Sequence, residues 1–275
     1  PRCNIEINDI LNDKYIIKKQ IGKGSYGDVF MGYDIIKKKD IAIKIHNNDN
    51  KYKNSINREY YIYNELNGII KKSNIKYYIP KLYETIYCNK FNCFILKLYG
   101  LNLYEFMREK YSTEQYTINF ITKICKNILL GMNFLVDNYI IHRDIKPENL
   151  LFNIEETDIV ICDFGMSKKS INPYESYYNE IQTIWYRAPE IALKQKYNYK
   201  IDTWSIGCIF YEMLLNKVLF KSKEDKDHII KICNLLGLPK DKYILENNIF
   251  KNINTSTLHT TTIDVKKLED KYKDV

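Results

Sequence analysis

The sequence predicts an α+β fold with a strand-rich first part and a mainly helical remainder. Short β-branched runs separated by turn residues occupy most of the chain up to about Leu103, and beyond it apolar residues recur at helical spacing. With 275 residues, the chain is long enough to bury a full core, as one large domain or as two lobes. Its composition of 45% hydrophobic and 28% charged residues is ordinary for a folded protein.

The first part is expected to hold strands at 15–22, 28–33, 40–45 and 91–98, and the first two flank a glycine-rich turn. Residues 55–67 switch to a helical period. This spacing places one set of residues on a common helix face: Glu59, Ile62, Tyr63 and Leu66.

The second part begins near residues 97–101. Residues 117–139 predict an amphipathic helix, whose core face would be formed by Ile118, Ile121, Cys125, Ile128, Leu129, Met132 and Leu135. Residues 203–215 are apolar nearly all round, which predicts a buried helix. From Asp241 the chain is polar and weakly patterned.

Composition narrows the classes of partner. The net charge is +8, but the lysines are dispersed and no arginine-rich arm accompanies them, so we expect no direct nucleic-acid partner. No apolar run is long enough to span a bilayer, and we expect no membrane association. The first residues lack the apolar stretch of a secretory signal, and the seven cysteines lack metal-ligand spacing. Both observations favour reduced thiols in the cytoplasm or the nucleus.

The first chemical signal is a glycine-rich turn, Gly22-Lys23-Gly24-Ser25-Tyr26-Gly27-Asp28-Val29. Glycines let the backbone approach a phosphate closely, although such a pattern alone is often only a turn. The predicted strand after the turn disfavours a dinucleotide fingerprint, which requires a helix there.

Lys44 follows in an apolar strand, where an ammonium is costly unless it meets an anion. Glu59 or nucleotide phosphates are the candidates. The plainer reading is that Lys44 reaches solvent and Glu59 is a surface charge.

Two further motifs decide between these readings. His142-Arg143-Asp144-Ile145-Lys146-Pro147-Glu148-Asn149 follows the long amphipathic helix, and Asp163-Phe164-Gly165 comes after it. With the glycine turn and Lys44, these motifs stand in the order found in eukaryotic protein kinases. The chain therefore resembles that family from Gly22 to about Pro239.

The resemblance implies a bilobal kinase fold, with a β-rich N-lobe (15–99) that contains one main helix and a helical C-lobe (100–275), and with ATP and Mg²⁺ between them. Lys44, paired with Glu59, would hold the α- and β-phosphates, and Asn149 and Asp163 would bind the metal. Asp144 would accept the proton of the substrate hydroxyl, and Lys146 would neutralise the transferring phosphoryl group. The remaining nucleotide contacts are implied at Ile21, Gly22, Gly24, Gly27, Val29, Ala42, Leu96, Lys97 and Tyr99.

Lys146 and Thr183 match the Ser/Thr pattern rather than the tyrosine-kinase pattern. The segment Thr183-Ile184-Trp185-Tyr186-Arg187-Ala188-Pro189-Glu190 and the later Leu235-Leu236-Gly237-Leu238-Pro239 resemble the CMGC group, and within it the cyclin-dependent kinases. In that group the counterpart of Arg187 shapes a pocket for proline, so Ser/Thr-Pro sites are the expected substrates.

The resemblance also implies a phosphate switch. Arg58, Arg143 and Lys168 match three basic positions that gather around an activation-loop phosphate in cyclin-dependent kinases. The acceptor threonine of that family is replaced here by Tyr178, beside Ser176 and Tyr177. Ser25 and Tyr26 occupy glycine-loop positions at which related kinases are phosphorylated for inhibition.

Three departures from the family keep alternatives open. Asn57 replaces an apolar residue of the cyclin-binding signature, so we expect no conventional cyclin, while a cyclin-like activator stays open. After Pro239 no segment supplies the family's final helices or the arginine that pairs with Glu190, so those helices are expected to be missing. The alternative function is a pseudokinase-like scaffold that binds nucleotide. A small-molecule kinase is disfavoured by the Ala188-Pro189-Glu190 segment.

Overall fold

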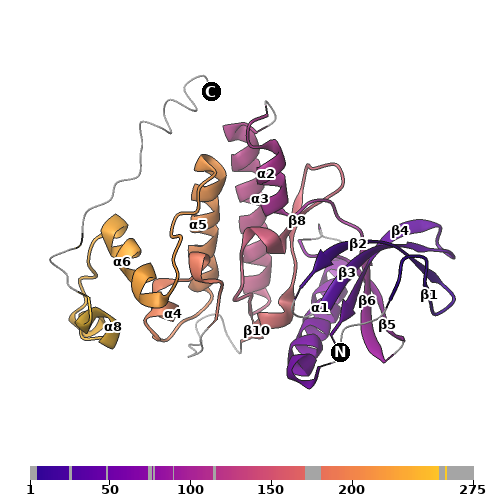
Figure 1. The fold of residues 1–275 in the computed structure, drawn as a ribbon, viewed down its shortest axis with the longest axis horizontal. Helices are drawn as coiled ribbons and strands as arrows, with labels where there is room; N and C mark the ends of the chain where they lie inside the picture. Colours follow the sequence, from indigo (N-terminus) through magenta and orange to yellow (C-terminus); the bar gives the residue numbers. More distant parts are fainter. Residues whose placement is uncertain are drawn as a thin grey trace. The chain divides into compact units, whose positions relative to one another are not determined.

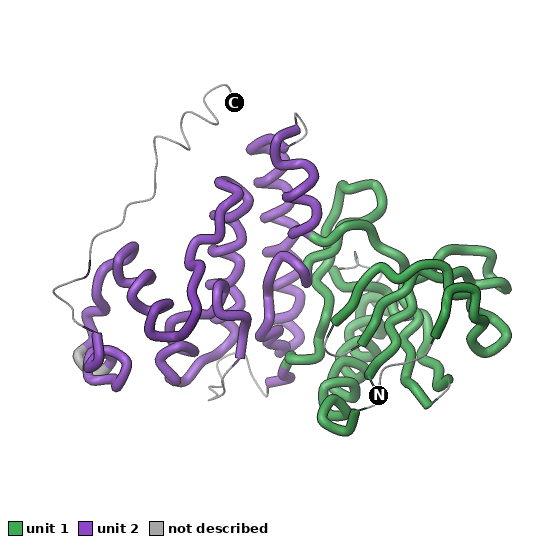
Figure 2. Tube along the Cα trace, in the orientation of Figure 1, with its two compact units in different colours: residues 1–102, 150–167 green, residues 103–149, 168–275 purple. Residues whose placement is uncertain are grey.

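The computed structural model describes residues 5–24, 27–47, 49–73, 76, 78–88, 90–113, 116–170, 181–253 and 258. The chain forms two compact units (Figure 2). Unit 1 comprises Pro1–Asn102 and Leu150–Ser167, and unit 2 comprises Leu103–Asn149 and Lys168–Val275. The predicted first lobe, 15–99, lies inside unit 1, to which the structure adds the later segment that carries Asp163.

Unit 1 is built on a six-stranded antiparallel sheet with the order β1-β2-β3-β4-β6-β5 (Figure 1). Its strands are β1 (Ile10–Leu11), β2 (Tyr15–Lys23), β3 (Gly27–Asp34), β4 (Lys39–His46), β5 (Leu82–Cys88) and β6 (Phe91–Lys97). The four predicted strands are present, with small shifts at their ends. The sequence reading missed β1 and β5. Strand β5 has the alternating burial of a half-exposed edge strand, and Glu84 interrupts its apolar pattern.

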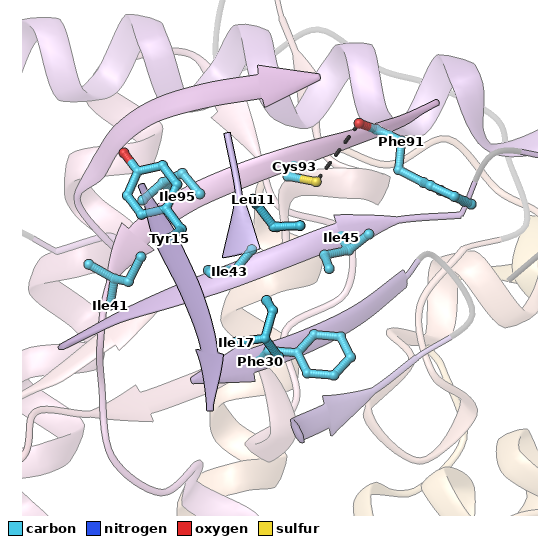
Figure 3. Packing of buried hydrophobic residues seen from close by; sticks show 10 residues of the cluster. All are labelled: Leu11, Tyr15, Ile17, Phe30, Ile41, Ile43, Ile45, Phe91, Cys93 and Ile95. Carbon is cyan, nitrogen blue, oxygen red and sulfur yellow. Dashed lines mark hydrogen bonds between the residues drawn. The ribbon is translucent and has the colours of Figure 1, made fainter. Parts of the chain in front are cut away.

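One face of this sheet forms a hydrophobic core (Figure 3). Strand β4 contributes Ile41, Ile43 and Ile45, each at most 2% exposed, and β2 contributes Tyr15 and Ile17. Because side chains alternate along a strand, Ala42, Lys44 and His46 lie on the opposite face. The helix α1 (Lys53–Ser73) buries Glu59, Ile62, Tyr63 and Leu66, as the sequence predicts, and extends beyond the predicted 55–67 at both ends.

The later segment of unit 1 contains a short hairpin. Strand β8 (Leu150–Phe152) pairs with β9 (Ile159–Ile161), and the turn η3 (Phe164–Met166) follows. Phe164 is fully buried. Its ring packs edge-on against the ring of Tyr63, with the two ring centroids 5.2 Å apart. The segment that carries Asp163 is thereby packed against α1.

Unit 2 is mainly helical. Its helices are α2 (Leu103–Lys110), α3 (Ile118–Asp137), α4 (Pro189–Ala192), α5 (Lys200–Leu215), α6 (Asp225–Leu236), α7 (Lys242–Leu245) and α8 (Asn248–Lys251). Strand β7 (Ile140–Ile141) pairs with β10 (Lys168–Lys169), and the single turns η2 (Pro147–Asn149) and η4 (Ile184–Tyr186) complete the unit. Over the described residues, no helix is long and apolar enough to cross a membrane.

Helix α3 begins after Thr117, whose side chain accepts a hydrogen bond from the Phe120 amide. Most of the predicted core face is buried, but the prediction for Leu129 is wrong, because its side chain is 50% exposed. Leu129 lies about 100° around the helix from Ile128, which places it outside the buried stripe. Ile124, which the prediction omitted, is fully buried in that stripe instead.

Helix α5 is mostly buried and starts earlier than the predicted 203–215, but it is not buried all round, because Thr203, Gly207 and Phe210 are exposed along one side. Three of its buried residues are polar: Asp202, Ser205 and Glu212. Buried polar groups need hydrogen-bond partners, and these residues find theirs in the loops that carry the predicted catalytic residues.

Candidate active site

The glycine-rich turn connects β2 to β3. Gly22 pairs with Val29, and the Gly24 amide donates to the Gly27 carbonyl oxygen at 2.9 Å. A Cβ at Gly27 would lie 2.2 Å from the carbonyl oxygen of Ile45, so only glycine fits beside β4. Ser25 and Tyr26 lie outside the described residues, and their predicted regulatory role stays a prediction.

Lys44, Glu59 and Asp163 form a charged cluster in unit 1. The Lys44 ammonium lies 2.7 and 2.8 Å from the two Glu59 carboxylate oxygens and 3.3 Å from Oδ1 of Asp163. Burial by itself would lower the pKa of Lys44, but the negative charges of Asp163 and Glu59 outweigh this effect and raise the pKa above its ordinary value. Lys44 is therefore a firmly protonated cation held by two carboxylates.

A face beside Lys44 collects several of the predicted nucleotide contacts. Val29 lies directly opposite Lys44 in the β3–β4 ladder, and Ala42 lies opposite Leu96 in the β4–β6 ladder. Directly opposed residues project to the same side of a sheet. This side therefore offers apolar surface next to an ammonium, as an adenine nucleotide requires. Of the other predicted nucleotide contacts, Ile21 lies near the glycine-rich turn and its side chain is 42% exposed. Lys97 is the last residue of β6, and Tyr99 lies two residues beyond it.

The backbone that follows Asp163 is clamped by α1. Arg58 and Ser55 both donate to the Gly165 carbonyl oxygen, at 2.6 and 2.8 Å. Asp163 itself has a left-handed backbone with φ of 66°, a sparsely populated conformation for a non-glycine residue. Sequence reasoning missed Ser55, although it lies one helical turn before Arg58 on the same face.

His46 is a second residue that sequence reasoning missed. Its Nε2 lies 3.3 Å from Glu59 Oε2, and its Nδ1 lies 3.1 Å from the Asn92 carbonyl oxygen. The signal was available, because a residue two positions after Lys44 on a strand shares its face.

Asp144, Lys146 and Thr183 form the second cluster, in unit 2. Lys146 Nζ lies 2.8 Å from Asp144 Oδ2 and 3.3 Å from the Thr183 hydroxyl. That hydroxyl donates to Asp144 Oδ1 at 2.9 Å, and the Thr183 amide donates to the same oxygen at 3.2 Å. The arrangement brings one carboxylate and one ammonium into contact with each other, and these are the group types that serve as a proton acceptor and as a charge-neutralising group.

Asn149 supports this carboxylate. Its Nδ2 donates to the Asp144 carbonyl oxygen at 2.8 Å. That contact orients the side-chain amide, and its oxygen has no partner among the described residues. Asn149 in unit 2 and Asp163 in unit 1 each offer an oxygen donor, the ligand type that Mg²⁺ prefers.

Asp202 on α5 holds the loop before Asp144. It accepts hydrogen bonds from the backbone amides of His142 at 2.7 Å and of Arg143 at 2.9 Å. Burial raises the pKa of Asp202, and these hydrogen bonds together with the nearby His142 and Arg143 work against that rise. Arg143 has φ of 70° and donates to the Tyr197 hydroxyl at 3.0 Å.

Gln182 anchors the end of the activation segment. Its amide nitrogen donates to the Ile201 carbonyl and to the Ser205 hydroxyl, and its amide oxygen accepts from the Ala188 backbone. Its own carbonyl oxygen accepts a hydrogen bond from Arg187 at 2.8 Å, and Arg187 also binds Asp225 at 2.7 Å.

Glu190 is half-buried, and no side chain among the described residues pairs with it. Burial raises its pKa, and its own backbone amide offsets part of the rise. The unpaired Glu190 predicted from the sequence is therefore seen within the described part of the chain.

The predicted regulatory residues are only partly visible. Ser176, Tyr177 and Tyr178 lie outside the described residues. Arg58 belongs to unit 1, and Arg143 and Lys168 belong to unit 2. The predicted phosphate switch stays a prediction.

The sequence of this chain is similar to known protein families and to individual proteins. The family model of the protein kinase domain matches residues 15–268. Dual specificity tyrosine-phosphorylation-regulated kinase 3 of Homo sapiens is 31% identical over 237 residues, which cover 86% of this chain and 39% of the relative. Serine/threonine-protein kinase ICK of Rattus norvegicus is 34% identical over 235 residues, covering 83% of this chain and 35% of the relative.

The chain thus spans less than half the length of these curated relatives. Both relatives are CMGC kinases, which confirms the group predicted from the sequence. ATP and Mg²⁺ are the cofactors that the family uses in general. The match to the family model covers nearly all of the described residues and both charged clusters, and the chain belongs to the protein kinase domain family, in its CMGC group.

Proposed function

We propose that this chain is the catalytic domain of a Ser/Thr protein kinase that transfers the γ-phosphoryl group of ATP to a protein hydroxyl. The observation that carries the proposal is the cluster of Asp144, Lys146 and Thr183. There the two carboxylate oxygens of Asp144 contact the Lys146 ammonium at 2.8 Å and the Thr183 hydroxyl at 2.9 Å, and that ammonium and hydroxyl lie 3.3 Å apart. Phosphoryl transfer depends on positioning and charge neutralisation more than on covalent help, and these groups supply both.

In this reaction Lys44 holds the phosphates of the nucleotide, and Glu59 keeps the Lys44 ammonium in place. Asp144 orients the acceptor hydroxyl and takes its proton at a carboxylate oxygen. Lys146 offsets the negative charge that the transferring group carries. Asp163 and Asn149 would hold Mg²⁺, which neutralises phosphate charge when bound.

The test replaces Asp144 by Asn and measures phosphorylation of a generic basic protein. We expect turnover to fall by roughly 10²-fold or more, because a positioned base is lost. Asp137→Asn is the matched control, since Asp137 lies at the exposed end of α3 and its carboxylate accepts a hydrogen bond from Asn133, away from the Asp144 cluster. Unchanged turnover in Asp144→Asn would instead favour the pseudokinase-like scaffold, which keeps nucleotide and partner binding.

Ser/Thr-Pro sites are the proposed substrates. The Gln182 carbonyl oxygen already accepts a hydrogen bond from Arg187, so it is a poorer acceptor for the backbone N–H of a substrate residue that follows the phosphorylated one. An N–H buried without a partner costs about 1–3 kcal/mol, and proline has none to bury. A peptide array in which Ser-Pro and Ser-Ala substrates react equally would refute this preference.

We also propose that tyrosine phosphorylation in the activation segment regulates the enzyme. The support is the sequence, in which Tyr178 replaces the acceptor threonine of cyclin-dependent kinases and Tyr177 lies beside it, and a relative whose name states tyrosine-phosphorylation-regulated. Mass spectrometry of fully active protein tests this. Unmodified Ser176, Tyr177 and Tyr178 in that protein would reject it.

For location we propose the cytoplasm or the nucleus, which the six free cysteines in the described residues support. Imaging of the tagged full-length protein tests this. For partners, a cyclin-like activator stays open, and a pull-down with candidate cyclins addresses it.

A further inference from the structure

Strand β4 presents two polar residues toward α1. Lys44 and His46 are two positions apart, so they project to the same side of the sheet, while Ile43 and Ile45 point into the core on the other side (Figure 3). His46 is 1% exposed, and its ring packs edge-on against Phe94 with the ring centroids 4.2 Å apart. A buried imidazole in this place needs partners for both of its nitrogens.

Both partners are hydrogen-bond acceptors. Nδ1 faces the Asn92 carbonyl oxygen at 3.1 Å, and Nε2 faces Oε2 of Glu59 at 3.3 Å. A neutral imidazole has a single N–H and can donate to only one of them, which leaves a lone pair against the other oxygen. The imidazolium has two N–H groups and satisfies both.

The surrounding charges favour the same state. The charged and titratable groups that lie near Lys44, Glu59 and Tyr63 are Lys44 on β4, Glu59 and Tyr63 on α1, Tyr99 just beyond β6, and Cys162 and Asp163 after β9. On the side of His46, Asn92 of β6 offers a neutral carbonyl oxygen, and the ring of Phe94 contacts both His46 and Tyr60 of α1. Two carboxylates therefore meet one ammonium, and a charged His46 makes the buried cluster neutral.

Lys44 shows why a second donor to Glu59 matters. An ammonium has three N–H groups, and three oxygens already surround Lys44: both oxygens of Glu59 and Oδ1 of Asp163. To donate to a nucleotide phosphate, Lys44 must release one of them. Oε2 of Glu59 is the oxygen that has a second donor, because His46 reaches it.

We propose that His46 is a positioning residue which, as the imidazolium, holds the Glu59 carboxylate in place while Lys44 turns one N–H toward the nucleotide. The inference rests on the proposed role of Lys44 in binding ATP. It predicts that ATP binding, rather than the chemistry at Asp144, responds to His46 and to its charge.

The experiment compares KM for ATP and kcat of the full chain from pH 6 to 8.5 in the wild type and in three variants. His46→Phe removes both donors and keeps an aromatic ring, and His46→Gln keeps an uncharged donor. Ile43→Val is the control, because it disturbs the same strand on the core side without approaching Glu59.

For His46→Phe we expect KM for ATP to rise about tenfold at pH 6.5, the size of one lost charge-assisted hydrogen bond, with a smaller change in kcat. The ratio of its KM to that of the wild type should depend on pH, because a neutral imidazole has one N–H and cannot donate to both oxygens. His46→Gln keeps a donor but not the charge, so it should recover only part of the loss at pH 6.5. Ratios to the wild type cancel the titration of ATP itself.

Equal KM values in His46→Phe and the wild type, or a ratio that is constant with pH, would overturn the proposal. If His46→Phe does not fold, the comparison of His46→Gln with the wild type remains, together with nitrogen NMR of the wild-type histidines. We expect two protonated ring nitrogens for His46 at pH 6.5, and a ring with one proton at that pH would overturn the proposal. Lys44→Met distinguishes a failure of the proposed ATP-binding role of Lys44 from a failure of the proposed role of His46. If Lys44→Met binds ATP as tightly as the wild type, Lys44 does not bind the nucleotide, whatever His46 does.

Discussion

The guanidinium of Arg58 donates a hydrogen bond to the carbonyl oxygen of Gly165, 2.6 Å away. The sequence reading assigned Arg58 to a phosphate-binding group, and in this structure one of its nitrogens binds the backbone that follows Asp163. Ser55 reaches the same oxygen. Helix α1 therefore holds the Asp163 segment with two residues in addition to the ionic link through Glu59 and Lys44.

A methyl group at Gly165 tests this clamp. A Cβ there would lie 2.6 Å from the Ser55 hydroxyl, so Gly165→Ala must displace that side chain. We expect KM for ATP to rise roughly tenfold, since small displacements of binding groups are costly. Adding Ser55→Ala should return part of the loss, because it removes the clash. Ser73→Ala, at the exposed end of α1, is the control, and a double variant no better than Gly165→Ala would contradict the clamp.

The second and third glycines of the glycine-rich turn, Gly24 and Gly27, should differ in their tolerance of alanine. At Gly27 a Cβ meets backbone oxygen at 2.2 Å, whereas at Gly24 the nearest atom is 3.5 Å away. We expect Gly27→Ala to lower the free energy of unfolding by about 1–3 kcal/mol, as overpacking does, and Gly24→Ala to change it little. Thermal unfolding of both variants checks the difference. Equal melting temperatures would show that β3 and β4 separate to admit the methyl group.

Thr183 bridges the proposed base and the proposed phosphate-neutralising lysine. Thr183→Ala removes the hydroxyl that contacts both Asp144 and Lys146, and we expect kcat to fall about tenfold with little change in KM for ATP. Thr183→Ser keeps the hydroxyl and should retain most of the activity. Steady-state kinetics of the pair measures this. A serine variant as slow as the alanine variant would mean that the methyl group, rather than the hydroxyl, supports the site.

Because Glu190 is half-buried, replacing its carboxyl group by a neutral amide should stabilise the protein by an amount that depends on pH. Its pKa is raised in the folded state by burial, so folding favours the protonated carboxyl. Stability is therefore lost as the pH rises from about the unfolded value of 4.5 through the raised folded value.

Glu190→Gln removes that cost and keeps an oxygen for the Glu190 backbone amide. We expect it to raise the melting temperature at pH 7, with a gain that shrinks below pH 4.5. Urea unfolding at several pH values gives the free energies. Glu246→Gln, on an exposed side chain, should show no such pH dependence. A constant or negative difference for Glu190→Gln would mean that a cation outside the described residues already pairs with it.

The sequence predicted the site best where chemistry and periodicity agree. Glu59 was expected on the inner face of its helix and Lys44 inside a strand, and the two side chains meet. The roles of His46 and Ser55 were not predicted, because a single histidine or serine forms no sequence pattern. These roles depend on the residues that the fold places next to them. The role of Asp202 was not predicted for the same reason, since its hydrogen-bond partners are backbone amides some 60 positions earlier in the sequence.

The errors in predicting the fold from the sequence have similar causes. Leu129 is apolar and only slightly off the period of α3, so sequence alone could not separate it from the buried stripe. Strand β5 is half-exposed and carries a glutamate that Lys14 and Tyr15 stabilise from β2 and the residue before it. Such a partner cannot be seen from the local pattern of β5.

The assignment of Leu150–Ser167 to unit 1 limits how the protein can be divided. The chain leaves unit 1 after Asn102, returns at Leu150 and leaves again after Ser167, so neither unit is a continuous stretch of sequence. An expression fragment that stops at Asn102 contains Lys44 and Glu59 but lacks Asp163 and the Gly165 carbonyl that α1 grips. A soluble nucleotide-binding fragment would need Leu150–Ser167 spliced on through a designed linker, and gene fusions or split reporters placed near Asn102 would cut the site's own residues apart.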